Sequence, residues 1–107
     1  MTTRPPETIA VIFVAQRSSD DDAGYSAAAE EMVALAATQP GYIGIDSVRG
    51  ADGLGVTVSY WADDAAAIGW RDHPRHAAIR DQSRGIWYTR YDLHVAAVTR
   101  SYDWTKS

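Results

Sequence analysis

Three histidines are the side chains of this chain that are best suited to proton transfer near neutral pH. Imidazole titrates close to neutrality without any perturbation, so His76 and His94 are the candidate general bases. His73 and His76 are three residues apart and could share a helix face, but a metal site needs a third ligand in a defined geometry. We therefore expect no metal. The chain has no cysteine, which excludes disulfides, thiolate zinc sites, iron–sulfur clusters and a cysteine nucleophile.

Aromatic residues are the second conspicuous group, with four tryptophans and six tyrosines in 107 residues. Such side chains line pockets and interfaces, and several flank the ends of expected strands: Tyr60, Trp61, Trp87, Tyr88 and Tyr91. The formal net charge of -4 disfavours nucleic acid and anionic membranes as partners. Pockets or subunit interfaces are therefore where we expect these aromatic side chains.

The elements that position these side chains follow from periodicity and turn residues. Residues 8–17 alternate with apolar side chains on both faces, which indicates a central strand covered on both sides. Pro40 and Gly41 end the first helix, and Asp63 or Asp64 caps the second. The expected strands are 8–17, 42–49, 54–61 and 91–102, and the expected helical segments are 25–38, 65–70 and 74–84, with a break near His73.

The order is β-α-β-β-α-β, the ferredoxin-like arrangement of the α+β class, in which helices cover one face of a four-stranded antiparallel sheet. The length allows a single domain, which we place at residues 8–104, with flexible termini at 1–7 and 105–107. No signal peptide or membrane span is evident, so a cytoplasmic protein is expected. The other sheet face is also apolar, and the chain has nothing left to cover it. We therefore expect a homodimer that packs sheet against sheet.

Five stretches resemble the antibiotic biosynthesis monooxygenase family, and the resemblance extends from about Thr8 to Trp104. They are VAQR at 14–17, QPGYIG at 39–44, DGLGVTVSYW at 52–61, GWRDHPRH at 69–76 and WY at 87–88. The resemblance implies a dimeric α/β barrel built from two ferredoxin-like subunits. It also implies an oxygenase, because the superfamily contains cofactor-independent monooxygenases that act on aromatic polyketide intermediates and monooxygenases that degrade haem.

The same resemblance suggests particular site residues. Gln16 stands where the family has an asparagine, Trp70 matches a family tryptophan, and Arg80 occupies the position of the iron-ligating histidine in the haem-degrading branch. Arginine cannot ligate iron, so haem would need His76 or His94 instead. Gln16, Trp70 and Arg80 suit the cofactor-independent branch better, where such groups hold an aromatic substrate and stabilise a negative oxygen.

We therefore expect a monooxygenase that needs no cofactor and oxidises an aromatic or polyketide-like small molecule with dioxygen. The expected catalytic residues are Gln16, Trp70, Arg80 and His76, and the expected substrate-binding residues are Phe13, Trp61, His94 and Trp87. Structural roles remain open for several: Trp70 as a core residue, Gln16 as a polar strand end and Arg80 on a solvated helix face. The alternatives are a haem-degrading monooxygenase and a non-catalytic dimer that binds a small molecule.

Overall fold

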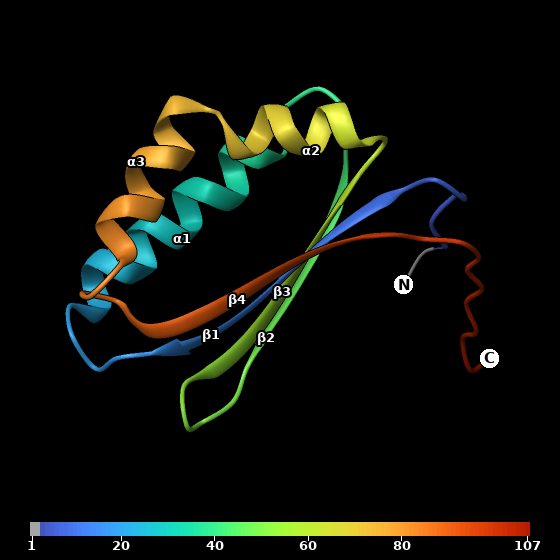
Figure 1. Cartoon of the computed structure of the whole chain (residues 1–107). Helices are drawn as coiled ribbons and strands as arrows, with labels where there is room; N and C mark the ends of the chain where they lie inside the picture. The colour runs from blue at the N-terminus through green and yellow to red at the C-terminus, as the bar shows by residue number, and fades with distance from the viewer. Residues whose placement is uncertain (1–2) are drawn as a thin grey trace.

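A computed structural model describes residues 3–107 as one four-stranded antiparallel sheet with three helices on one of its faces (Figure 1). The strand order is β2-β3-β1-β4, so β1 and β3 are central and β2 and β4 form the edges. The elements are β1 (Ile9–Arg17), α1 (Asp22–Ala36), β2 (Tyr42–Arg49), β3 (Leu54–Trp61), α2 (Asp64–Arg71), α3 (Pro74–Ser83) and β4 (Tyr88–Ala97). The ferredoxin-like fold expected from the sequence is confirmed, with the second helical region divided into two helices.

The helices begin at side chains that cap them. The Asp63 carboxylate accepts a hydrogen bond from the Ala66 amide (2.8 Å) at the start of α2. Pro74 is the first residue of α3, where its missing N–H costs nothing, and Nδ1 of His73 accepts from the Arg75 amide (3.1 Å). This cap turns the chain between α2 and α3, as expected from the break near His73.

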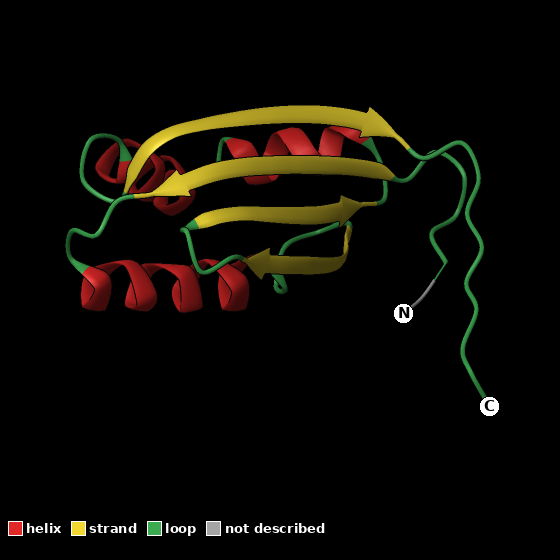
Figure 2. Ribbon diagram, turned by 90° about the horizontal axis from the view of Figure 1, so that it is seen from below, coloured by secondary structure: helices red, strands yellow, loops and turns green. Residues whose placement is uncertain are grey.

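Strand pairing assigns each strand residue to one of the two sheet faces, because side chains alternate and paired residues share a face. Ile9 pairs with Trp61 and Val11 with Ser59, and these residues face the helices. The core lies there, around the completely buried Trp61, which packs against Ala36 of α1 and the helix α2. Figure 2 shows that the opposite face carries no helix.

This opposite face, called the open face below, is apolar along its two central strands. Ile12 and Val14 of β1 pair with Val58 and Val56 of β3, and all four are only partly buried. An uncovered apolar surface in the middle of a sheet is unusual for a monomeric protein.

The last strand differs from the expectation at both ends. We expected residues 91–102, whereas β4 runs from Tyr88 to Ala97. The reason for the earlier end is its neighbour: Ala97 pairs with Ile9, the first residue of β1, and beyond it only Val98, within the described chain, still forms backbone hydrogen bonds to the residues that precede β1. Within residues 3–107 we also find no helix with the length and apolarity to cross a membrane.

Candidate active site

A stack of two rings joins α2 to α3. The centroids of the Trp70 indole and the His76 imidazole are 4.2 Å apart, with an angle of 9° between the planes. Trp70 also stacks on Trp61 of β3, with centroids 6.0 Å apart. Trp70 is therefore a core residue, as its helical spacing suggested, and it also holds His76 in a fixed orientation.

The hydrogen bond of His76 fixes its tautomer. Its Nδ1 lies 2.9 Å from the carbonyl oxygen of Trp70, and because a carbonyl only accepts, Nδ1 carries the proton. Burial lowers the pKa of His76 below its ordinary value of 6.5, and the nearby charges of Arg80 and His73 lower it further. The carbonyl bond acts in the opposite direction. At neutral pH the imidazole is therefore neutral, and Nε2 has a free lone pair.

Two groups of this stack have no partner within the described chain: Nε2 of His76 and the indole N–H of Trp70. Among residues 3–107 no buried side-chain nitrogen or oxygen lacks a hydrogen bond, so both groups must reach accessible space. One is a proton acceptor and the other a hydrogen-bond donor. Together they can remove a proton from a bound molecule and stabilise a negative oxygen on it.

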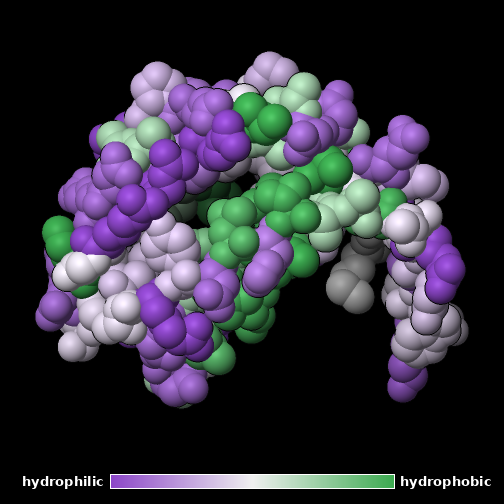
Figure 3. Space-filling model, in the orientation of Figure 1, coloured by the Kyte–Doolittle hydropathy of each residue, from purple (hydrophilic) through white to green (hydrophobic). Residues whose placement is uncertain are grey.

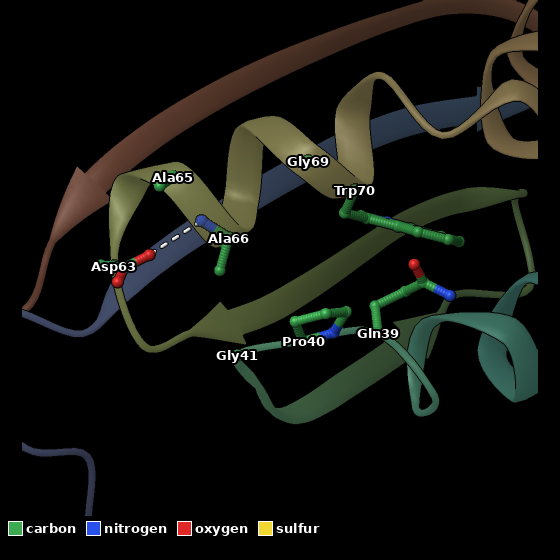
Figure 4. Close-up of a pocket in the computed structure, with 8 residues that line it drawn as sticks. All are labelled: Gln39, Pro40, Gly41, Asp63, Ala65, Ala66, Gly69 and Trp70. Carbon is green, nitrogen blue, oxygen red and sulfur yellow. Dashed lines mark hydrogen bonds between the residues drawn. The ribbon is translucent and has the colours of Figure 1, made fainter.

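Trp70 lines a cavity of about 440 Å³ between α2 and the turn that precedes β2 (Figure 4). Gln39 and Pro40 form the opposite wall, and Gly41 has a φ of +80°. A Cβ at Gly41 would lie 2.4 Å from the Ala66 Cβ, so only glycine lets the turn approach α2 this closely. The volume is within the range of small-molecule sites.

Gln39 is a candidate that sequence reasoning missed. Its amide nitrogen donates to the Leu35 carbonyl (3.2 Å) and to the Thr38 hydroxyl (3.0 Å), and Figure 4 shows its oxygen on the side of Trp70. The Gln-Pro-Gly sequence was interpreted only as a helix end. The proximity of this turn to α2 is a tertiary feature that no local pattern reveals.

Arg80 lies one helical turn after His76 on α3, so the two side chains share a helix face. Its Nη1 donates to the carbonyl oxygen of Arg71 (3.2 Å), which ties α3 back to the end of α2. Arg80 is partly buried, and its charge acts on His76. Of the expected site residues, the structure thus brings Trp70, His76, Arg80 and Trp61 together.

Phe13 faces the helices as well, but it belongs to a second aromatic cluster. Its ring centroid is 5.4 Å from Tyr88 and 5.2 Å from Tyr91. Burial and the neighbouring Tyr25 raise the pKa of Tyr88 far above its ordinary value, so this phenol stays protonated.

The helical layer does not cover the sheet completely on the side of β4. Leu93 and Val95 point toward the helices, yet they are 52% and 54% exposed. Figure 3 shows a hollow with apolar residues between the helices and the sheet. The part of the sheet between the stack of Trp70 and the cluster around Phe13 therefore offers a second apolar surface to a bound molecule.

The other expected residues lie elsewhere. Gln16 is seven positions from Ile9, so it is on the open face and about 23 Å farther along β1. Its amide donates to the Asp52 carbonyl (2.7 Å). His94 pairs with Ile12 and is also on the open face. Trp87 donates to an Asp21 carboxylate oxygen (3.1 Å) at the start of α1. None of these three residues shares a cavity with Trp70.

Metal ligands do not gather anywhere in residues 3–107, since no group of three or more His, Asp or Glu side chains could hold an ion there. Arg80 cannot ligate iron, whereas the free Nε2 of His76 has the chemistry of an axial haem ligand.

Comparisons with known proteins agree with this architecture. The Bacillus subtilis protein YqjZ is 48% identical over 98 residues, which is 92% of this chain and 85% of that protein. The crystal structure of SnoaB, a cofactor-independent oxygenase from Streptomyces nogalater, superposes with a TM-score of 0.69 at 18% identity, covering 87% of this chain and 96% of SnoaB. Rv0793 from Mycobacterium tuberculosis gives a TM-score of 0.70 at 20% identity, covering 86% of this chain and 93% of that one.

At these identities the two solved structures establish the fold alone. The family itself is established by sequence, because the model of the antibiotic biosynthesis monooxygenase family matches residues 8–82, most of the chain. Together with the fold, this match shows that the chain belongs to the antibiotic biosynthesis monooxygenase family.

Proposed function

We propose that this protein is a cofactor-independent monooxygenase that oxidises an aromatic, polyketide-like small molecule with dioxygen. The observation that carries the proposal is the Trp70–His76 stack, in which a neutral imidazole packs against a tryptophan that lines a cavity. Family membership and the fold shared with SnoaB support the same reaction class.

The reaction needs a base and a dry apolar site. An anthrone, in which a CH₂ group is flanked by two aryl rings and lies opposite a ketone, gives a proton to Nε2 of His76 and becomes an enolate. The enolate passes one electron to dioxygen, and the resulting radical and superoxide combine to form a peroxide anion. Protonation by the imidazolium gives a hydroperoxide, which loses water and leaves a carbonyl. Two C–H bonds are broken, and one oxygen atom enters the product while the other leaves as water.

The protein supplies orientation and charge stabilisation for these steps. The Trp70 N–H belongs to the ring that stacks on His76 and would stabilise the enolate or peroxide oxygen. Arg80 adds positive charge near the same imidazole, since its charge helps to lower the pKa of His76. Trp61 supports Trp70 from the sheet, while Phe13, Leu93 and Val95 offer apolar surface toward the helices. Gln16, Trp87 and His94 have no part in this site within one subunit.

We further propose that the protein acts as a homodimer that buries the open faces of two subunits. The apolar centre of this face supports the arrangement, because it would otherwise remain in water. Packing of two such sheets leaves the helices outside, and with them both sites.

Oxygen uptake tests the activity. Protein that has been dialysed against chelator and freed of flavin is given a panel of anthrones and quinols in an oxygen electrode. We expect uptake by the wild type, and a loss of about 10² or more in kcat/KM for His76→Gln because a positioned base is removed. His73→Asn is the matched control: asparagine still caps α3, so its rate should stay close to the wild-type rate.

The non-catalytic alternative makes the opposite prediction. If no member of the panel is consumed above the buffer rate while apolar aromatic ligands still raise the melting temperature, the protein binds such molecules without oxidising them.

Haem degradation is the second candidate, and the free Nε2 of His76 is the observation that favours it. Titration with micromolar hemin tests it directly. A shifted Soret band that disappears in His76→Ala would support haem binding, whereas an unchanged hemin spectrum would exclude it.

A further inference from the structure

Three aromatic side chains lead from the candidate active site to the edge of the sheet. Trp70, which lines the cavity, stacks on Trp61 with ring centroids 6.0 Å apart and an angle of 23° between the planes. Trp61 in turn packs against Tyr42, with centroids 5.7 Å apart and planes at 80°. Both separations are typical of interacting aromatic pairs. The three rings, called the aromatic row below, connect α2 through β3 to the start of β2.

The row is a single path that is buried along most of its length. Trp61 is completely buried and Trp70 is only 9% exposed, whereas Tyr42 is half-buried on the edge strand β2. Among residues 3–107, Trp70 and Tyr42 are the only ring partners of Trp61. No ring pair of the described chain joins the row to the cluster around Phe13. One end of the path is therefore at the cavity and the other is near solvent.

Indole and phenol are the aromatic side chains that lose one electron most easily, and electrons pass quickly between rings this close. The Trp61 N–H donates to the buried Ser59 hydroxyl (3.0 Å), so an oxidised Trp61 cannot release its proton to water. Its positive charge stays in the core, which is unfavourable. An oxidised Tyr42 releases its phenolic proton to water and becomes a neutral radical. Oxidation that begins at Trp70 therefore ends at Tyr42.

We propose that the aromatic row protects the candidate active site by supplying electrons from Tyr42 to an oxidised Trp70. This inference rests on the proposed oxygenase function, because the oxidant comes from incomplete turnover. When superoxide escapes before it combines with the substrate radical, that radical adds another dioxygen and forms a peroxyl radical. The peroxyl radical takes one electron from Trp70 and one proton from water, and it becomes a hydroperoxide.

The electron that Trp70 loses is replaced along the row. Trp61 passes one electron to Trp70, and Tyr42 passes one electron to Trp61, so both tryptophans return to their original state. Tyr42 has then lost one electron, and its phenolic proton goes to water. A hydrogen atom from a dissolved thiol restores the phenol and leaves a thiyl radical. The stack of Trp70 on His76 thereby escapes permanent oxidation.

The row can be tested without any substrate, because the chain has no cysteine and an introduced one can carry a photo-oxidant. Asp72→Cys places a ruthenium polypyridyl label at an exposed position in the turn just after Trp70. A laser flash in the presence of a cobalt(III) quencher converts the label to a one-electron oxidant. Transient absorption then distinguishes tryptophan radicals from tyrosyl radicals.

We expect a short-lived tryptophan radical that is replaced by a tyrosyl radical. In the labelled protein, Tyr42→Phe should abolish the tyrosyl signal and prolong the tryptophan signal. Trp61→Phe, with its fold checked by circular dichroism, should also abolish the tyrosyl signal. Tyr60→Phe is the matched control, because Tyr60 is next to Trp61 in β3 but lies on the open face, and its signals should equal those of the labelled parent. A tyrosyl radical that persists in Tyr42→Phe, or none in the labelled parent, would overturn the proposal.

The protective role has its own measurement in the unlabelled protein. With an anthrone and dioxygen, Tyr42→Phe should start at the wild-type rate but lose activity after fewer turnovers, and mass spectrometry should detect oxidised Trp70. Inactivation no faster than that of the wild type would overturn the protection. An active oxygenase in which the flash yields no Tyr42 radical removes only the row. A protein that forms this radical but consumes no oxygen removes the oxygenase and its protection, and keeps the electron path.

Discussion

The buried hydrogen bond between Trp61 and Ser59 gives a quantitative test of the core that supports the site. The Trp61 indole N–H donates to the Ser59 hydroxyl (3.0 Å), and both residues are buried under the helices. Trp61→Phe keeps an aromatic ring beside Trp70 but removes the donor. Ser59→Ala removes the acceptor and leaves the indole N–H unpaired.

The expected magnitude comes from three contributions. Phenylalanine buries roughly 50 Å² less apolar surface than tryptophan, which corresponds to about 1.2 kcal/mol. The unfilled volume of roughly 40 Å³ adds about 1 kcal/mol, and the unpaired Ser59 hydroxyl adds about 1 kcal/mol. Trp61→Phe should therefore lower the free energy of unfolding by about 3 kcal/mol, and Ser59→Ala should lower it by about 1–2 kcal/mol.

The double variant Trp61→Phe/Ser59→Ala leaves neither group unpaired. Its loss should therefore be smaller than the sum of the two single losses by about 2–3 kcal/mol, because both unpaired-group penalties disappear. Urea unfolding at 25 °C, monitored by circular dichroism at one fixed protein concentration, measures all four free energies. Losses that add within about 0.5 kcal/mol would refute the buried hydrogen bond and the packing inferred from it.

Three further predictions concern the helices. Because burial lowers the pKa of His76, the unfolded chain binds a proton below pH 6.5 that the folded chain does not bind. The contribution of His76 to the free energy of unfolding should be complete above pH 6.5 and fall below it, by at most about 1.4 kcal/mol per pH unit. In urea titrations at several pH values, His76→Gln should remove this part of the pH dependence. Asp63→Ala should cost about 1 kcal/mol in the same assay, because the Ala66 amide loses its cap, whereas Asp63→Asn should cost little. The exposed Glu31–Arg75 ion pair joins α1 to α3. Glu31→Gln should therefore lower the thermal midpoint of unfolding only slightly, and by even less in about 1 M salt, because salt screens exposed charges. A large change in the midpoint that does not depend on salt would contradict the exposure of the pair.

The fold could be predicted from the sequence because its signals are local. Apolar residues on both faces of 8–17 indicate a central strand, and β1 is central. Pro40 and Pro74 mark a helix end and a helix start through their own geometry. The end of β4 could not be predicted in this way, because it depends on where β1 begins on the neighbouring strand.

The site was predicted less completely, and strand alternation explains part of the difference. Phe13 and Gln16 are three positions apart on β1, so they lie on opposite faces of the sheet and cannot line one pocket within a subunit. The family resemblance assigned Gln16 to the site by matching motifs, and motif matching does not consider which face of the sheet a side chain occupies. The stacking of His76 on Trp70 depends on the angle between α2 and α3, which no sequence pattern specifies.

Oxygen uptake with an anthrone, followed across pH in the absence of added cofactor, tests the central claim most directly. We predict that the wild type consumes one dioxygen for each anthrone converted to the quinone. The rate should fall on the acid side below pH 6.5, as His76 becomes protonated, and His76→Gln should lose that limb together with the activity. Wild-type uptake no faster than buffer, or undiminished uptake by His76→Gln, would contradict the account.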